Sequence, residues 1–221
     1  MTGLLASCDS STDPAPAISP KVEIYALDQS IEGKTYKEWA AEWWKQMDLT
    51  PKSQNILFDE TGSRVLNGVS TVNSNLLFLG GVFNESGTAT RTATIPSGKT
   101  LFFPVLNGQF DTVGTPMSVA ERQDILDGAF DSAKDLSVTV DDSVIANVAT
   151  YRVAGDLFSY VSIADNISDY PAGIQVSDVA NDGYYLAIKP LAKGAHTIRI
   201  KGTIPGTPDF HLDVTYNLTV Q

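Results

Sequence analysis

The strongest constraint on the fold is the final stretch "FHLDVTYNLTV" at 210–220, where apolar and polar residues alternate without a break. Successive side chains of a β-strand point to opposite faces, so one face of this segment is apolar. That apolar face consists of Phe210, Leu212, Val214, Tyr216, Leu218 and Val220. A strand with one buried and one solvated face is typical of an antiparallel sheet packed on a second layer.

Short apolar stretches separated by turn residues predict further strands. They lie at 21–27, 75–83, 88–95, 99–106, 136–140, 144–153, 157–163, 183–189 and 196–202. No internal repeat is visible, and no alternation of strands with helices supports a parallel sheet. We therefore expect a mainly β fold, an antiparallel β-sandwich of jelly-roll or immunoglobulin-like type.

Two amphipathic helices are expected beside the sandwich, at about 36–48 and 119–134. Each opens with a capping box, Thr35 to Glu38 and Ser118 to Glu121. The second helix carries a row of acidic residues opposite its apolar face, which we interpret as a solvated surface: Asp124, Asp127, Asp131 and Asp135. Residues 22–221 are expected to form a single β-rich domain. A subdivision near 115–135, with an immunoglobulin-like C-terminal half, is the alternative.

All three tryptophans of the chain, Trp39, Trp43 and Trp44, lie in the first predicted helix. They either anchor that helix in a core or form an aromatic surface that grips a ligand. At 100° per residue Trp39 and Trp43 fall in the apolar stripe, and Trp44 lies at its edge. An isolated helix of this length is marginal in water, and each buried tryptophan removes about 150 to 250 Å² from solvent. We predict a buried anchor and keep Trp44 as a candidate binding residue.

Composition excludes several kinds of chemistry. A net charge of −11 and a pI of about 4.4 argue against nucleic acid as a partner. A single cysteine rules out an intrachain disulfide and a thiolate metal cluster. His211 lies on the polar face of the last strand, and His196 is expected to bond a nearby backbone carbonyl. Without further ligands, neither a metal site nor a cofactor is predicted.

The N-terminal segment indicates export. Leu5-Ala6-Ser7-Cys8 has the order of a bacterial lipobox, in which the cysteine thiol receives a lipid. The following "DSSTDPAPAISP" is polar and proline-rich, which is typical of a flexible tether. We expect residues 1–21 to be a lipobox remnant with its tether, and Cys8 to anchor the protein to the cell envelope on its periplasmic or surface side.

Three stretches resemble a widespread, uncharacterised family of secreted bacterial proteins. They are "TYKEWAAEWWKQ", "IPSGKTLFFPVLN" and "NDGYYLAIKPLAKGAHTIRIKGTIPGTPDFHLDVTYNLTV". Together they cover about a third of the chain. The resemblance implies export and a mostly β fold. It brings no reaction and no catalytic residues.

The segment "LFFPVLNGQFD" contains the best candidate for a binding site. If strand alternation holds throughout, Asn107, Gln109 and Asp111 continue the face that carries Leu101, Phe103 and Val105. A switch from apolar to polar on an inward face predicts a polar pocket, with Trp44 and the Tyr184–Tyr185 pair as aromatic walls. The alternative is a strand that simply ends here.

Three classes of function follow from these features. The first is a non-enzymatic, lipid-anchored binding module for a glycan or protein ligand. The second is a carboxylate-dependent glycan hydrolase, which needs two acids about 5 to 9.5 Å apart and would draw on Asp59, Glu60 and Asp111. The third is a structural surface module that pairs through an exposed edge of the terminal strand 210–220. The sequence favours the first.

Overall fold

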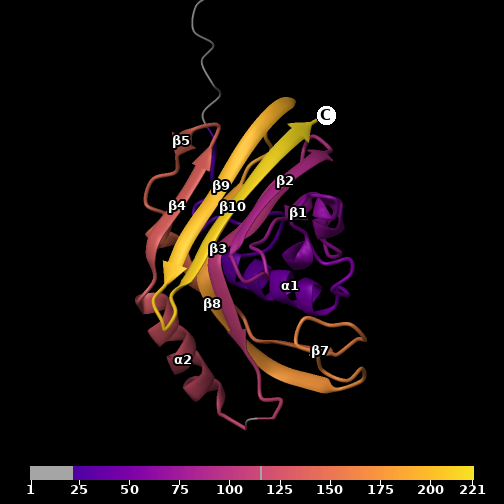
Figure 1. The fold of residues 1–221 in the computed structure, drawn as a ribbon, viewed down its shortest axis with the longest axis vertical. Coiled ribbons are helices and arrows are strands. Elements are labelled where there is room, and N and C mark those ends of the chain that lie inside the picture. The colour runs from indigo at the N-terminus through magenta and orange to yellow at the C-terminus, as the bar shows by residue number, and fades with distance from the viewer. Residues whose placement is uncertain (1–21, 115) are drawn as a thin grey trace, which may run out of the picture.

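A computed structural model describes residues 22–114 and 116–221 of the protein, and the fold is mainly β, as predicted. Two sheets pack face to face, and helix α1 lies beside them (Figure 1). The α-helices are α1 (Tyr36–Asp48) and α2 (Val119–Asp131), and the 3-10 helices are η1 (Ile56–Phe58), η2 (Val65–Gly68) and η3 (Val148–Tyr151). The strands are β1 (Leu76–Phe78), β2 (Thr88–Ile95), β3 (Thr100–Phe110), β4 (Lys134–Val140), β5 (Ser143–Val144), β6 (Arg152–Ala154), β7 (Phe158–Val161), β8 (Gln175–Ile188), β9 (Gly194–Ile204) and β10 (Phe210–Val220).

Each sheet combines strands from both sides of the 115–135 segment. The first has the order β1-β3-β8-β6, with β7 also paired to β8, and the second has the order β2-β10-β9-β4-β5. The long pairings β3–β8 and β9–β10 are antiparallel, as predicted. The edge pairings β1–β3 and β2–β10 are parallel, a difference from the all-antiparallel expectation. The fold class is therefore confirmed, with parallel strands added at two edges.

Strand β10 confirms the predicted alternation and corrects the predicted edge. Every second residue from Leu212 to Val220 is buried, although Phe210 at the strand start is 44% exposed. Both edges of β10 are occupied, because β2 pairs with one side and β9 with the other. The idea of a structural module that pairs through an exposed edge of this strand is wrong.

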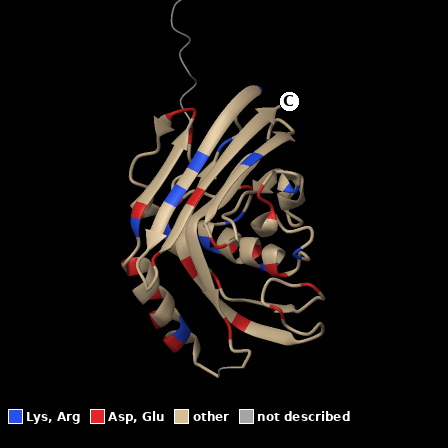
Figure 2. Ribbon diagram, viewed as in Figure 1, with Lys and Arg blue, Asp and Glu red and all other residues tan. Residues whose placement is uncertain are grey.

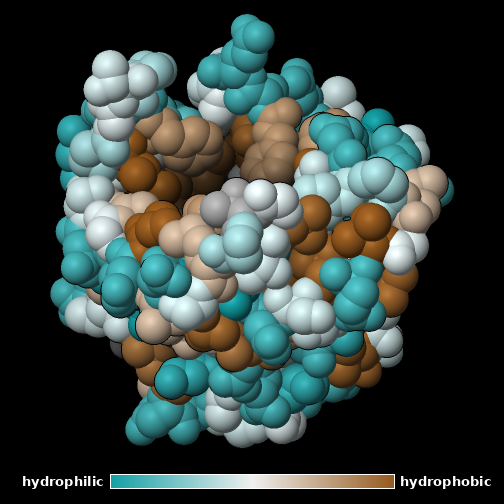
Figure 3. Space-filling model, turned by 90° about the horizontal axis from the view of Figure 1, so that it is seen from below, coloured by the Kyte–Doolittle hydropathy of each residue, from teal (hydrophilic) through white to brown (hydrophobic). Residues whose placement is uncertain are grey.

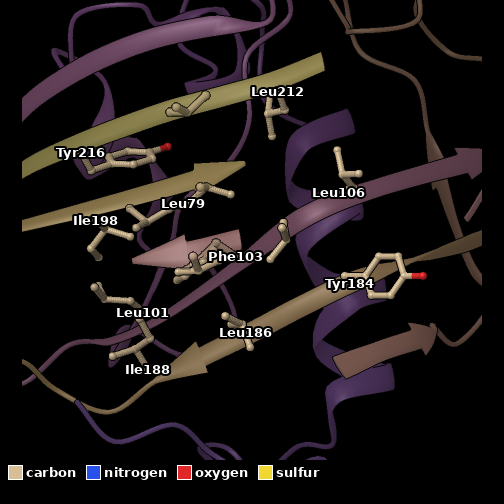
Figure 4. Close-up of a cluster of buried hydrophobic side chains, with 14 of the residues drawn as sticks. Leu79, Leu101, Phe103, Leu106, Tyr184, Leu186, Ile188, Ile198, Leu212 and Tyr216 are labelled. Carbon is tan, nitrogen blue, oxygen red and sulfur yellow. The ribbon is translucent and has the colours of Figure 1, made fainter. Parts of the chain in front are cut away.

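The described residues form two hydrophobic cores. The first lies between the sheets, where Leu101 and Phe103 of β3 face Ile198 of β9 and Tyr216 of β10 (Figure 4). Leu126 and Phe130 of α2 pack into the same core. The second lies on the other face of the first sheet, between that sheet and α1. The first sheet is therefore buried on both faces along much of its length.

Helix α1 is fastened into the second core by its tryptophans, as predicted. Trp39 and Trp43 are fully buried, and Trp44 is only 4% exposed. The indole N–H of Trp39 donates to Ile31 O at 2.6 Å, and that of Trp43 donates to Leu79 O at 2.9 Å. The capping box of Thr35 and Glu38 is also present. In the described part of the chain, no helix has the length and apolarity to cross a membrane.

Several local predictions are wrong. In place of the strand predicted at 21–27, the described residues 22–27 contribute an isolated bridge from Ile24 to Ile188, and 144–153 divides into β5, η3 and β6. Helix α2 ends at Asp131, three residues earlier than expected.

The acidic side of α2 is only partly a solvated surface. Acidic residues recur along the helix (Figure 2), and Asp124 is exposed. Asp127 and Asp131, however, form ion pairs with Arg152 of β6. The same guanidinium pairs with the buried Asp182 at 2.8 Å. Arg152 therefore ties α2 to the first sheet.

Another arginine, Arg91, ties the second sheet to two neighbouring loops. Arg91 of β2 is fully buried and donates to the carbonyl oxygens of Ile56, Asp59, Gly80 and Gly81. It also donates to the Tyr216 hydroxyl of β10, which in turn donates to Gly80 O at 2.7 Å. These bonds connect the loop that follows η1 with the segment that follows β1.

Candidate functional site

A β-bulge in β3 decides where the predicted polar residues point. The register against β8 shifts between Pro104 and Leu106, so that Val105 is an extra residue. Leu106 consequently faces the sandwich core, opposite Tyr184. From Asn107 onward the polar side chains face α1. The prediction that they continue the face of Leu101, Phe103 and Val105 is wrong, because one inserted residue reverses the alternation.

The polar residues nevertheless come together with most of their predicted neighbours, beneath the C-terminal half of α1. We call this group the polar cluster. It consists of Trp44 and Asp48 of α1, Asn107, Gln109 and Asp111 at the end of β3, Tyr160 of β7, Tyr170 of the following loop, and Asn181 and Tyr185 of β8.

Hydrogen bonds hold the cluster in two parts. Asn107 Nδ2 donates to the Tyr185 hydroxyl at 3.3 Å, and Gln109 Nε2 donates to Asp48 Oδ1 at 2.9 Å. The Tyr170 hydroxyl lies 3.1 and 2.9 Å from the two oxygens of Asp111. Asp111 Oδ1 also accepts the amide N–H of Val113 at 2.8 Å, which closes the turn after β3.

Several buried polar atoms of the cluster have no hydrogen-bond partner among the described residues. They are Trp44 Nε1, Asp48 Oδ2, Gln109 Oε1 and Asn181 Oδ1. Trp44 lies close enough to Tyr185, and Asp48 to Tyr160, for each pair to interact electrostatically, but neither pair forms a hydrogen bond of ordinary geometry. Asn181 is the register partner of Gln109 on the adjacent strand, and Asp48 follows Trp44 by one helical turn. Only one other buried side-chain atom in the described residues, Thr100 Oγ1, lacks a partner. Unpaired buried polar groups are rare in proteins, so their concentration here marks a site.

The electrostatics of the cluster are dominated by two carboxylates. Burial raises the pKa of Asp48 to about 7, and the negative charge of Asp111 adds to this rise against the opposing effects of Gln109 and Tyr160. Burial also raises the pKa of Tyr160, and both carboxylates raise it further. The pKa of Tyr170 rises to about 12 through burial and its bond to Asp111. Neither carboxylate takes part in an ion pair among the described residues.

The cluster extends from the interior to the surface. Asp48 is fully buried, whereas Asn107, Gln109, Asp111 and Tyr170 are half-buried. Asn107 also borders a small cavity of about 40 Å³ with mainly apolar walls, among them Leu57, Val82, Phe83, Leu106, Phe210 and Leu212. Seen from below, the molecule has a hollow with hydrophobic walls (Figure 3).

One predicted aromatic wall lies elsewhere. Tyr184 points into the sandwich core, and its hydroxyl donates to Phe130 O of α2 at 2.9 Å. Tyr185 faces α1 and is fully buried. Adjacent residues of one strand cannot line the same pocket, because their side chains point to opposite faces.

The carboxylates proposed for a hydrolase are not brought together as predicted. Asp59 is buried and accepts the amide N–H groups of Thr61, Gly62 and Arg64. Burial alone would raise the pKa of Asp59, but these donors lower it below its ordinary value. Glu60 accepts from Asn84 at 2.9 Å. Asp59 and Glu60 shape a loop, and the carboxylate that Asp111 influences is that of Asp48.

The histidines have structural partners. His196 Nε2 lies 2.8 Å from Ala192 O, which confirms the predicted contact with a backbone carbonyl, and Nδ1 lies 2.7 Å from Asp141 Oδ2. His211 is exposed, as predicted, and contacts Thr203 Oγ1 at 3.1 Å. In the described ranges, no group of three or more His, Cys, Asp or Glu residues could hold a metal ion.

Comparisons with known proteins add little. No protein-family model matches the sequence, and no curated protein matches it significantly. Among solved structures, the cysteine protease inhibitor EhICP2 from Entamoeba histolytica is 11% identical, with 66% of this chain and 96% of that chain covered and a TM-score of 0.26. Amebosin is 15% identical, with 61% and 96% covered and a TM-score of 0.22. Both scores are too low to establish a common fold or function.

Proposed function

We propose that the protein is a non-enzymatic binding module of the bacterial cell envelope and that the polar cluster takes a small polar ligand. In this proposal a lipid on Cys8, which lies outside the described residues, anchors the module to a membrane face. The lipobox order of residues 5–8 and the polar tether after Cys8 support the anchor. A sandwich of two five-stranded sheets supports a rigid scaffold.

The unpaired buried atoms of the cluster are the observation that carries this proposal. Leaving a buried donor or acceptor unpaired costs about 1 to 3 kcal/mol. Trp44 Nε1, Asp48 Oδ2, Gln109 Oε1 and Asn181 Oδ1 all bear this cost on one face of the first sheet. A polar ligand that reaches them from the half-buried side of Asn107 and Asp111 would offset it.

A ligand screen tests the binding function. Glycans, peptides, amines and amino acids are added to the purified protein, and the shift in melting temperature is measured. We expect at least one class to raise Tm, and we expect Asn107→Ala and Asp111→Ala to remove that rise while Asp124→Asn, an exposed acid on α2, retains it. Ligands that stabilise the variants as well as the parent would refute a site at the polar cluster.

The anchor is tested separately in cells. With an intact export signal, we expect the full-length protein to fractionate with membranes and to incorporate a fatty-acid label. Cys8→Ser should release it into the soluble fraction without changing its fold. Equal membrane association of the Cys8→Ser variant would contradict lipidation.

Hydrolysis is a second candidate, because the cluster contains two acids in different environments. A raised pKa suits a general acid, and a neighbouring carboxylate suits a nucleophile or base. Asp48 would be the acid and Asp111 its partner, in place of the pair predicted from sequence. Turnover of chromogenic glycosides that both Asp48→Asn and Asp111→Asn abolish would favour this function over simple binding.

A further inference from the structure

The charges in the polar cluster limit the chemical class of ligand that it can bind. Asp48 and Asp111 share the cluster, and the influences on the pKa values of Asp48, Tyr160 and Tyr170 come from carboxylates, tyrosines and polar side chains rather than from lysine or arginine. An isolated negative charge in a protein interior is costly unless it is neutralised or paired. The carboxylates of the cluster therefore require a positive group or a proton to offset their charge.

The unpaired buried atoms of the cluster also favour a positively charged ligand. Three of the unpaired atoms are acceptors, on Asp48, Gln109 and Asn181, and only Trp44 Nε1 is a donor. An ammonium group carries three N–H donors and a positive charge, and it has no acceptor. It complements this set better than a hydroxyl group, which brings one donor and no charge.

The aromatic residues around the polar cluster favour an organic cation over a metal ion as its ligand. Trp44, Tyr160, Tyr170 and Tyr185 border the carboxylates and amides of the cluster. Aromatic rings attract organic cations through their negative faces, typically by about 0.5 to 2 kcal/mol. A divalent metal ion is instead held mainly by carboxylates, and the described residues contain no group of three or more His, Cys, Asp or Glu residues that could hold one.

We propose that the polar cluster binds the primary ammonium group of a small organic amine. This inference rests on the proposed binding function and assigns its ligand class. Asp48 Oδ2 and Gln109 Oε1 accept N–H bonds from the ammonium group, and Asp111 adds charge from the half-buried side. Where Asp48 is protonated, binding ionises its carboxyl group and releases that proton to solvent, so affinity increases with pH until Asp48 is fully ionised.

Matched charged and neutral compounds test the inference on the whole chain. Calorimetry is run with 1,4-diaminobutane and with butane-1,4-diol, which has the same length but no charge, and glucose serves as an unrelated neutral ligand. We expect the diamine to bind and the diol to bind at least tenfold more weakly. Repeating the titration in buffers of different ionisation enthalpy should show proton release near pH 7.

Variants show whether binding occurs at the cluster. Asp48→Asn and Gln109→Met should each weaken diamine binding at least fivefold, while Asp124→Asn leaves it unchanged. Circular dichroism verifies that each variant folds, and the Gln109→Met result stands if Asp48→Asn does not fold. Diamine binding of equal strength in parent and Gln109→Met protein would overturn the inference.

The two proposals fail in different ways. Suppose that the diol or glucose binds more tightly than the diamine, and that Gln109→Met abolishes this binding. That result would overturn the assignment of an ammonium ligand, and the proposed binding function would still hold. Failure of the diamine, the diol, glucose and every class in the wider screen to bind would overturn both.

Discussion

Replacement of Asp48 by asparagine tests the energetics of the polar cluster most sharply. The pKa of Asp48 is about 7 in the folded protein against an ordinary value of 3.8, because the carboxyl group is buried and lies near Asp111. Between these two values the folded protein keeps a proton that the unfolded chain has released. Stability therefore falls as pH rises through this window, and it remains lower above it.

The size of the effect follows from the pKa difference. A separation of about 3 units, at about 1.4 kcal/mol per unit, gives up to about 4 kcal/mol of stability lost between pH 4 and pH 8. Asparagine has nearly the same shape and stays uncharged, so Asp48→Asn lacks this loss. Its Oδ1 can still accept from Gln109 Nε2.

Urea unfolding followed by tryptophan fluorescence measures the difference directly, because all three tryptophans are buried in the core beside α1. We expect parent and Asp48→Asn to be similar in stability at pH 4 and the variant to be more stable by a few kcal/mol at pH 8. Asp124→Asn is the matched control, and its difference from the parent should change little with pH. A stability difference for Asp48→Asn that is constant from pH 4 to 8 would refute the reasoning.

Three further substitutions test the packing around the site, each by urea unfolding. Trp43→Ala should cost about 3 to 5 kcal/mol, since it opens a cavity in the second core; a cost under 1 kcal/mol would contradict the anchor. Tyr216→Phe should cost about 1 to 3 kcal/mol, because Arg91 and Gly80 lose a buried partner. Gly183→Ala should cost about 1 to 3 kcal/mol, since the new methyl would lie 2.4 Å from Leu106 O; an unchanged midpoint would contradict this.

Local signals in the sequence were sufficient for the elements that depend on near neighbours. The bounds predicted for the first helix agree with α1, because Thr35 and Glu38 form a capping box and Pro51 stops the helix shortly after Asp48. The alternation at 210–220 likewise predicted β10, because its inward face meets an apolar core along almost its whole length.

The site was predicted in part, and the reason for the error is specific. Asn107, Gln109 and Asp111 do share a face, but the bulge at Val105 turns that face toward α1. Pro104 beside the bulge has no amide N–H to donate, which was a local hint of irregular pairing. Alternation alone cannot show on which strand an extra residue is accommodated.

Other members of the cluster depend on contacts that are distant in sequence. Tyr160 and Tyr170 reach Asp48 and Asp111 from β7 and the loop after it, and no local pattern places them there. The sequence did contain a signal for Asp48, because this residue follows Trp44 by four positions and so lies on the same side of α1. A carboxylate in line with a buried indole could have been recognised as an inward acid.

A high-resolution crystal structure of the protein soaked with 1,4-diaminobutane at pH 8 would show whether an ammonium group occupies the polar cluster. We expect density for a terminal amine within hydrogen-bond distance of both Asp48 Oδ2 and Gln109 Oε1. Separate water molecules bonded to those atoms, with the diamine elsewhere or not bound, would contradict this expectation.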